Sequence, residues 1–95
     1  MDSRQLEYVI AIAEEKNLLH AAEKLFVSSS ALSQALSKLE SSIGTPLFSR
    51  TKAGLIPTET GLLYIDMAYD ILHRERKTLK LIQEKNSGSI EHFSI

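Results

Sequence analysis

The sequence predicts a mainly α-helical fold, with three short helices, a two-stranded hairpin and one long helix at the end. Apolar residues recur at helical spacing up to Pro46, and short β-compatible segments with turn residues follow it. Residues 59–86 then contain no proline and a single glycine, as expected for one long helix. This order of elements is that of a winged helix-turn-helix, with the hairpin as its wing, followed by a linker helix.

The first two helices are predicted from apolar periodicity and capping residues. Residues 3–16 carry apolar side chains at positions i, i+3, i+4 and i+7 of one helical face. These side chains are Leu6, Val9, Ile10 and Ala13. Asp2 and Gln5 have the spacing of a capping box, and Asn17 can end this helix. Residues 19–25 then predict a second, short helix.

A third helix is expected to begin after Ser28, a residue type favoured at helix N-caps, and to run to about Ile43. Gly44 suits the left-handed position after the helix, and Pro46 prevents the helix from resuming. Only residues 26–28 connect the second helix to the third, which is the connection length of a helix-turn-helix. Other corners between two helices share this geometry, so the turn alone does not define the motif.

The third helix has an apolar face and a polar face of unusual composition. The apolar stripe is predicted to face the core and consists of Leu32, Leu36, Leu39 and Ile43. The opposite half carries short, uncharged polar side chains, which are Ser30, Ser33, Gln34, Ser37 and Ser41. Such side chains let a helix lie close to another surface, and they can bind base edges and phosphates in a major groove about 12 Å wide. A solvated face that is merely rich in serine is the alternative, and the short turn and the wing favour DNA recognition over it.

The hairpin is predicted from two short segments, Leu47–Thr51 and Leu55–Thr58, with residues 52–54 between them. Gly54 is expected at the turn, and Pro57 confines the second strand to a sheet edge or to its own end. A hairpin directly after a helix-turn-helix is the arrangement of a wing.

The long helix is expected to begin after Thr58, a candidate N-cap, and to cover residues 59–86, a length of about 42 Å. Apolar residues along it follow steps of three and four, broken only by Glu75, as in a coiled-coil seam. The predicted dimerisation seam consists of Ile65, Ala68, Leu72, Leu79 and Ile82. We expect this stripe to pair with a second copy of the chain in a homodimer. The alternative is a helix that folds back on its own core.

The last residues predict a change of structure. Ser87–Ser89, with Gly88 between the serines, is typical of a hinge, and residues 90–95 begin a strand-like alternation. One strand cannot bury itself, so we interpret it as the start of a further domain. The predicted organisation is a winged helix-turn-helix DNA-binding domain at residues 1–58 and a dimerisation helix at residues 59–86. Residues 87–95 would then be a hinge and the start of an absent effector-binding domain.

Charge and composition narrow the class of function. The net charge is −1, but residues 16–58 hold five basic and two acidic residues between two acidic flanks, a local charge of +3 that permits a phosphate-facing surface. The absence of cysteine excludes disulfides and thiolate metal sites and suits a reducing cytosol. There is no signal-peptide pattern and no apolar run of about 20 residues, so we expect a soluble, cytoplasmic chain without membrane contact.

Catalysis finds no support in the sequence. His20, His73 and His92 fall on different elements and have no partner at metal-ligand spacing. Phosphate-binding loops and nucleophile motifs are missing. We therefore expect no enzyme, no cofactor and no metal.

Five sequence segments together point to one family. They are L-E-Y-V-I-A-I-A-E-E (6–15), A-A-E-K-L (21–25), V-S…S-x-x-L-S-x-x-L-x-x-L-E (27–40), G-T-P-L-F-x-R (44–50) and P-T-E-T-G (57–61). In this order, over about residues 3–86, the chain closely resembles the N-terminal DNA-binding domain of LysR-type transcriptional regulators. The resemblance implies sequence-specific binding of double-stranded DNA at a pseudo-palindromic promoter site. It also implies linker helices that pair antiparallel in a dimer, and a C-terminal domain that senses a small-molecule inducer.

The resemblance also assigns roles to residues. The family's base-reading positions fall on Ser29, Ser30, Ser33 and Gln34. Its phosphate-contacting positions fall on Lys38 and Arg50, and Lys52 lies in the wing. Ser28 would cap the recognition helix, and Ser37 would keep the same face short. A winged-helix module that binds protein or is purely structural, without binding DNA, is the alternative function.

Four positions depart from the family pattern. The family commonly has Gln-Pro at the positions of Ser29 and Ser30, and often Arg at that of Gln34. We therefore expect fewer strong base contacts and more dependence on DNA shape. Leu19 replaces a usual small polar residue, which is expected to remove a side-chain cap worth about 1 kcal/mol from the second helix.

Overall fold

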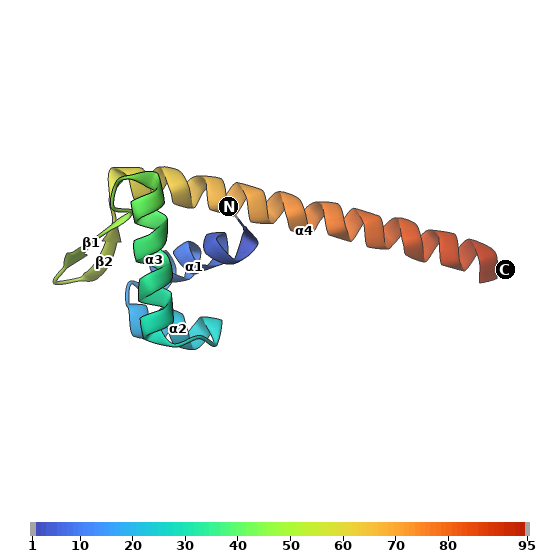
Figure 1. Ribbon diagram of the computed structural model, residues 1–95. Coiled ribbons are helices and arrows are strands. Elements are labelled where there is room, and N and C mark those ends of the chain that lie inside the picture. Colours follow the sequence, from blue (N-terminus) through green and yellow to red (C-terminus); the bar gives the residue numbers. More distant parts are fainter. Residues whose placement is uncertain (1, 95) are drawn as a thin grey trace.

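In the computed structural model of the protein (Figure 1), three short helices and a hairpin gather around the first half of one long helix. The backbone is described for residues 2–94 and the side-chain surroundings for residues 2–87. The elements are α1 (Ser3–Glu15), α2 (Leu18–Leu25), α3 (Ser29–Ile43), β1 (Phe48–Thr51), β2 (Gly54–Pro57) and α4 (Glu59–Ser94). The second half of α4 projects from this body, so the molecule measures 61 × 24 × 23 Å. The predicted winged helix-turn-helix with a long closing helix is confirmed.

Short polar side chains begin the helices, as predicted. Asp2 Oδ1 accepts a hydrogen bond from the Gln5 N–H at 3.0 Å, and Ser28 Oγ accepts one from the Ala31 N–H at 3.1 Å. At the start of α4, the Gly61 N–H donates to Thr58 Oγ1 at 3.0 Å. These bonds satisfy donors that the first turn of a helix leaves free.

The junction between α1 and α2 differs from the prediction. α1 ends at Glu15, and Lys16 rather than Asn17 adopts the left-handed conformation after it, with φ at 60°. Asn17 instead caps α2, because its Oδ1 accepts a hydrogen bond from the His20 N–H at 2.9 Å. The cap that Leu19 was expected to remove is therefore present, supplied one residue before the helix.

One core holds the elements together. It is built mainly from α1, the middle of α2, the inner faces of α3 and α4, and the wing with the preceding Leu47. Leu32 and Leu39 of α3 are buried and Leu36 is half-buried, as predicted, but Ile43 is exposed. The reason is that α3 packs against α1 and α2, and its last turn reaches past them toward the start of α4 (Figure 1).

The wing is an antiparallel pair in which Phe48 lies opposite Pro57 and Thr51 opposite Gly54. Gly54 has a φ of 106°, the left-handed region that favours glycine, which confirms its place at the turn. A Cβ at this position would also collide with the Lys16 carbonyl oxygen. The Leu55 N–H donates to that same oxygen at 2.9 Å, which ties β2 to the junction between α1 and α2.

α4 is longer than predicted. It runs to Ser94, through the predicted hinge at Ser87–Ser89 and through residues 90–94 of the segment 90–95, which was expected to form a strand. Ile95 lies outside the described residues. Both predictions were wrong. No proline interrupts this stretch, and one interior glycine costs a helix only about 1 kcal/mol relative to alanine. A lone strand has no partner for its backbone groups, whereas a continuing helix satisfies them within itself.

The inner face of α4 packs on the rest of the chain. Ala68 is fully buried and Leu72 is 4% exposed, while Ile65 is half-buried against the same core. The prediction that these residues pair with a second copy was therefore wrong for Ala68 and Leu72, and the alternative of packing on the chain's own core holds there. The cause is the packing of α4 against α1, which covers this side of the helix. Beyond the body, the side chains of Leu79 and Ile82 are 52% and 50% exposed.

Over residues 2–94, none of the helices has the combination of length and apolar character that crossing a membrane requires. Among the residues whose side chains are described, no three potential metal ligands of the His, Cys, Asp or Glu type gather in one place.

Candidate nucleic-acid interface

The polar face of α3 is open to solvent, and its residues line one shallow depression. Ser29, Ser30, Gln34, Ser37 and Lys38 are exposed, and Ser33 is half-buried. The depression encloses about 650 Å³ and is lined by Ala31, Ser33, Gln34, Ala35, Ser37, Lys38 and Ser41. The structure thus brings together the predicted residues from the middle of α3.

Ser28 lies at the edge of this face and is already engaged. Its hydroxyl caps the Ala31 N–H and lies 3.4 Å from the Ser30 hydroxyl. Because the cap uses this hydroxyl as an acceptor, it remains able to donate. Ser28 therefore both orients the start of α3 and adds a donor to its surface.

Ala31 and Ala35 also line the depression, and neither was predicted as a site residue from the sequence. Their spacing of i and i+4 places both on one face of α3, which was the available signal. Methyl groups in a major groove can contact the methyl group of thymine. Together with Ser33 and Gln34, they make a surface of small side chains with few charges.

The wing supplies the second group of predicted residues. Arg50 lies on β1 opposite Leu55, Lys52 lies in the turn, and both are exposed. Thr51 stiffens this turn, because its hydroxyl donates to the Gly54 carbonyl at 2.9 Å and accepts from the Ala53 N–H at 3.1 Å. The wing thus presents two cations on a short, braced hairpin.

Not every base of the middle segment is available to phosphate. Lys24 Nζ lies 2.9 Å from Glu14 Oε1 and 3.6 Å from Glu15 Oε2. The hydrogen bond that Lys24 donates to Glu14 raises the pKa of Lys24, so this lysine stays charged and paired with α1. Three of the five basic residues in this segment were predicted to lie on the polar face of α3 or on the wing. They are Lys38, Arg50 and Lys52.

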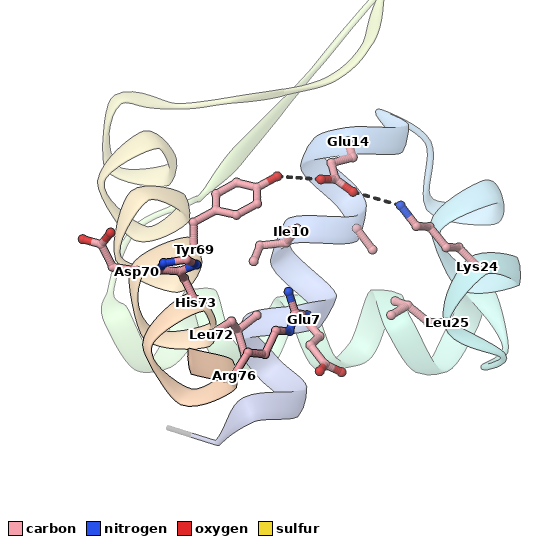
Figure 2. Close-up of a pocket in the computed structure, with 11 residues that line it drawn as sticks. Glu7, Ile10, Glu14, Lys24, Leu25, Tyr69, Asp70, Leu72, His73 and Arg76 are labelled. Atoms are coloured by element: carbon pink, nitrogen blue, oxygen red, sulfur yellow. Dashed lines mark hydrogen bonds and ion pairs between the residues drawn. The ribbon is translucent and has the colours of Figure 1, made fainter. Parts of the chain in front are cut away.

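A second depression, of about 670 Å³, lies between α1, α2 and α4 (Figure 2). At its rim, the Tyr69 hydroxyl donates to Glu14 Oε2 at 2.6 Å, and Lys24 holds the other oxygen. The hydrogen bond from Tyr69, and then that from Lys24, lower the pKa of Glu14. We call this chain of Tyr69, Glu14 and Lys24 the helix clasp, because it joins α4, α1 and α2.

The helix clasp is absent from the sequence predictions. Glu14 and Tyr69 are 55 positions apart, and no periodicity within either helix indicates that they meet. The lining of the depression mixes acids and bases over an apolar floor. At its rim, the hydrogen bond between Tyr69 and Glu14 raises the pKa of Tyr69 and lowers that of Glu14.

A capped, tight helix-turn-helix, an exposed polar face on its second helix and a cationic wing define a class of protein: DNA-binding transcriptional regulators. The sequence profile of one family, "Bacterial regulatory helix-turn-helix protein, lysR family", matches residues 3–62, and the chain belongs to this family. This match confirms the resemblance to LysR-type regulators that the sequence motifs indicated.

Curated relatives are themselves regulators. The uncharacterized HTH-type transcriptional regulator YcgK of Bacillus subtilis (strain 168) is 34% identical over the whole chain, which covers 29% of YcgK. The DNA-binding transcriptional dual regulator OxyR of Escherichia coli (strain K12) is 40% identical over 80 residues, 84% of the chain and 26% of OxyR. The chain therefore spans less than a third of the length of these relatives.

Solved structures agree in fold. The DNA-binding domain of CbnR in complex with DNA matches with a TM-score of 0.80 and 31% identity, covering 88% of the chain and 97% of that structure. The BenM DNA-binding domain with benA site 1 DNA matches with a TM-score of 0.86 and 27% identity, covering 93% of the chain and 99% of that structure. These comparisons support a DNA-binding regulator and give no support to a winged helix without DNA binding.

Proposed function

We propose that the chain binds a promoter site on double-stranded DNA by placing α3 in the major groove and the wing against the adjacent backbone. The observation that carries this proposal is the shallow depression on α3, which is open, lined by small polar and methyl groups, and followed by a cationic wing. The solved DNA complexes of CbnR and BenM domains support it by similarity.

The proposed roles divide between sequence reading and anchoring. Ser29, Ser30, Ser33 and Gln34 contact bases, with Ser28 and Ser37 at the edges of the same face. Lys38, Arg50 and Lys52 contact phosphates. Because hydroxyl and amide groups make weaker base contacts than arginine does, we expect the shape and deformability of the DNA to contribute much of the specificity.

Fluorescence anisotropy with the promoter DNA of the chain's own gene, at several salt concentrations, tests the proposal. We expect tighter binding than to a random duplex of equal length, and an affinity that falls as salt rises. Arg50→Ala and Lys38→Ala should each weaken binding to all sequences and reduce the salt slope by about 1. Equal affinity for promoter and random DNA, without a salt slope, would refute the proposal.

We further propose that α4 forms the dimer interface, through a face that shares only Ile82 with the predicted seam. Leu63, Ile71 and Ile82 are exposed, and they fall within about 100° of one another on the helical wheel of α4. This stripe continues from the body of the protein into the projecting half. A second copy of the chain is the simplest cover for such a stripe.

Light scattering tests this dimer. Replacing both Ile71 and Ile82 with Glu should give monomers, because two charges would be buried at the interface. Lys80→Glu is the control, since Lys80 lies on the opposite side of α4 and is exposed. A dimer that survives the double substitution excludes this face.

The wider function follows from this DNA-binding role. A regulator of promoter DNA would act in the bacterial cytoplasm, at the nucleoid. The relatives are more than three times as long as the chain, so we assign any response to a small-molecule inducer, and any oligomer above the dimer, to sequence outside these 95 residues.

A further inference from the structure

The loop between α3 and the wing is organised around one residue, Glu40. Its backbone carbonyl accepts hydrogen bonds from the Gly44 N–H at 2.8 Å and the Thr45 N–H at 3.2 Å, which closes the end of α3. Its carboxylate oxygen Oε2 accepts from the Leu47 N–H at 2.6 Å and from the Phe48 N–H at 3.4 Å. Four successive donors along the loop therefore converge on Glu40.

The buried position of Leu47 in the loop requires its hydrogen bond to the Glu40 carboxylate. Leu47 is fully buried, so its N–H group must find a partner inside the protein. A carboxylate accepts only, and it forms stronger bonds with N–H groups than a neutral acceptor does. Glu40 is half-buried, which limits the competition from water for this contact.

Other hydrogen bonds attach the wing to different elements. Lys16, at the junction of α1 and α2, holds the Leu55 N–H. Thr58, at the start of α4, donates its hydroxyl to the Pro46 carbonyl at 2.7 Å and its N–H to the Leu47 carbonyl at 2.9 Å. Among the described hydrogen bonds, the side-chain link between α3 and the wing is that of Glu40.

We propose that Glu40 is a positioning residue for DNA binding, whose carboxylate fixes the wing relative to the polar face of α3. This inference rests on the proposed DNA-binding function, in which α3 and the wing must reach the same duplex together. Glu40 acts through Leu47 and Phe48, and it does not contact the DNA.

The sign of the effect on affinity separates positioning from simple electrostatics. DNA repels carboxylates, so removing an acid near a DNA-binding surface should strengthen binding. If Glu40 positions the wing, its removal should weaken binding instead. The two explanations therefore predict opposite changes for the same substitution.

Anisotropy with the promoter duplex and a random duplex tests this sign. Glu40→Ala should weaken binding to both by about tenfold, the effect of losing one well-placed group. Glu40→Gln should lose only about two- to threefold, because the amide oxygen can still accept from the Leu47 N–H. Glu23→Gln, which removes an exposed acid from α2, is the matched control and should bind as tightly as the unmodified chain or more tightly.

A double substitution gives a measurement that a loss of stability alone would not change. Lys52→Ala should weaken DNA binding in the unmodified chain but have little further effect beside Glu40→Ala, because a displaced wing no longer places Lys52 on the DNA. Fully additive effects, or a Glu40→Ala variant that is folded and binds as well as the unmodified chain, would overturn the inference.

A measurement without DNA keeps the inference independent of the proposed function. Since the chain has no cysteine, spin labels can be placed by Ser41→Cys on α3 and Ala53→Cys in the wing turn, both at exposed positions. Glu40→Ala should broaden the distribution of distances between the labels, and Glu40→Gln should broaden it less. An unchanged distribution in both variants refutes the positioning role, whereas failure of the unmodified chain to prefer promoter DNA refutes only the proposed function.

Discussion

At the scale of single residues, the packing of α3 explains why its polar face can be rich in serine. Serine is a poor helix former because its hydroxyl competes for backbone hydrogen bonds. The apolar face offsets this, with Leu32 fully buried and Leu39 nearly so. The polar face can therefore consist of short side chains, which leave α3 free to approach another surface closely.

Phe26 is a residue with a conformation that its side chain does not favour. It ends α2 with φ at 59°, in the left-handed region, and its ring is 95% exposed. Such a backbone costs a bulky residue about 1–2 kcal/mol, and an exposed ring contributes little packing in return.

We therefore predict that Phe26→Asn stabilises the protein, because asparagine tolerates this conformation. The free energy of unfolding should rise by about 0.5–1 kcal/mol, which corresponds to an increase in Tm of about 2–8 °C. Thermal unfolding followed by circular dichroism measures it. Leu19→Asn is the control, since it removes another exposed apolar side chain from an ordinary helical position and should bring no gain. An unchanged or lower Tm for Phe26→Asn would show that the left-handed residue carries no strain.

Residue-scale features that depend on near neighbours were predictable from the sequence. Asp2, Ser28, Gly44 and Thr58 all take the capping positions that local patterns assign to them. The roles of Glu14 and Glu40 were not predictable, because each depends on an element brought close only by folding. Their partners are 55 and 7 positions away along the chain, and neither pair lies on one helical face.

At the scale of elements, periodicity predicted which residues of α4 are apolar but not which side is covered. The spacing of Ile65, Ala68 and Leu72 suits either a second copy or the chain's own core. The structure decides for the core, because α1 occupies that side of α4. The face left exposed is centred near Ile71, one residue before the buried Leu72.

The helix clasp makes the packing of three helices depend on pH. The pKa of Glu14 is lowered in the folded protein, first by the hydrogen bond from Tyr69 and then by that from Lys24. A lowered carboxyl pKa contributes stability above its unfolded value of 4.5, and this contribution is lost as pH falls through the folded value. Because Glu14 and Lys24 are 43% and 51% exposed, solvent keeps this contribution small.

We predict that Glu14→Gln lowers the free energy of unfolding at pH 7 and that its difference from the unmodified chain shrinks below about pH 4.5. Urea unfolding at pH 7, 5 and 3 measures this difference. Tyr69→Phe should lower the stability at pH 7 in the same direction, since it removes the donor to Glu14. The control Glu23→Gln changes an exposed acid of α2 outside the clasp. A difference between Glu14→Gln and the unmodified chain that stays constant with pH contradicts the role of the clasp.

At the scale of the whole molecule, α4 connects a packed half to a projecting half without a break. Its first half is fixed to the core at Gly61, Ala68 and Leu72, and its second half carries exposed Leu79 and Ile82. The two halves share one helical axis in Figure 1. The proposed dimer stripe crosses from one half to the other, so it exists only while both halves keep the same rotation.

We predict that inserting one alanine after Arg76 weakens the dimer, because every later residue turns by about 100° relative to the core. Inserting four alanines turns them by only about 40° beyond a full turn and should restore much of the association. Light scattering over a concentration series measures both, and circular dichroism checks that the helix content is kept. If one and four added residues weaken the dimer equally, the stripe does not span the two halves.

The continuous α4 also fixes the rotation of its far end relative to the body of the protein. Each residue between Leu72 and Ile82 adds about 100° of rotation and 1.5 Å of translation, so the number of residues sets the direction in which the far end faces. A dimer joined through α4 would convert that number into the relative orientation of its two α3 helices. The permitted spacing between the two halves of a DNA site would then depend on a count of residues in a segment outside α3 and the wing.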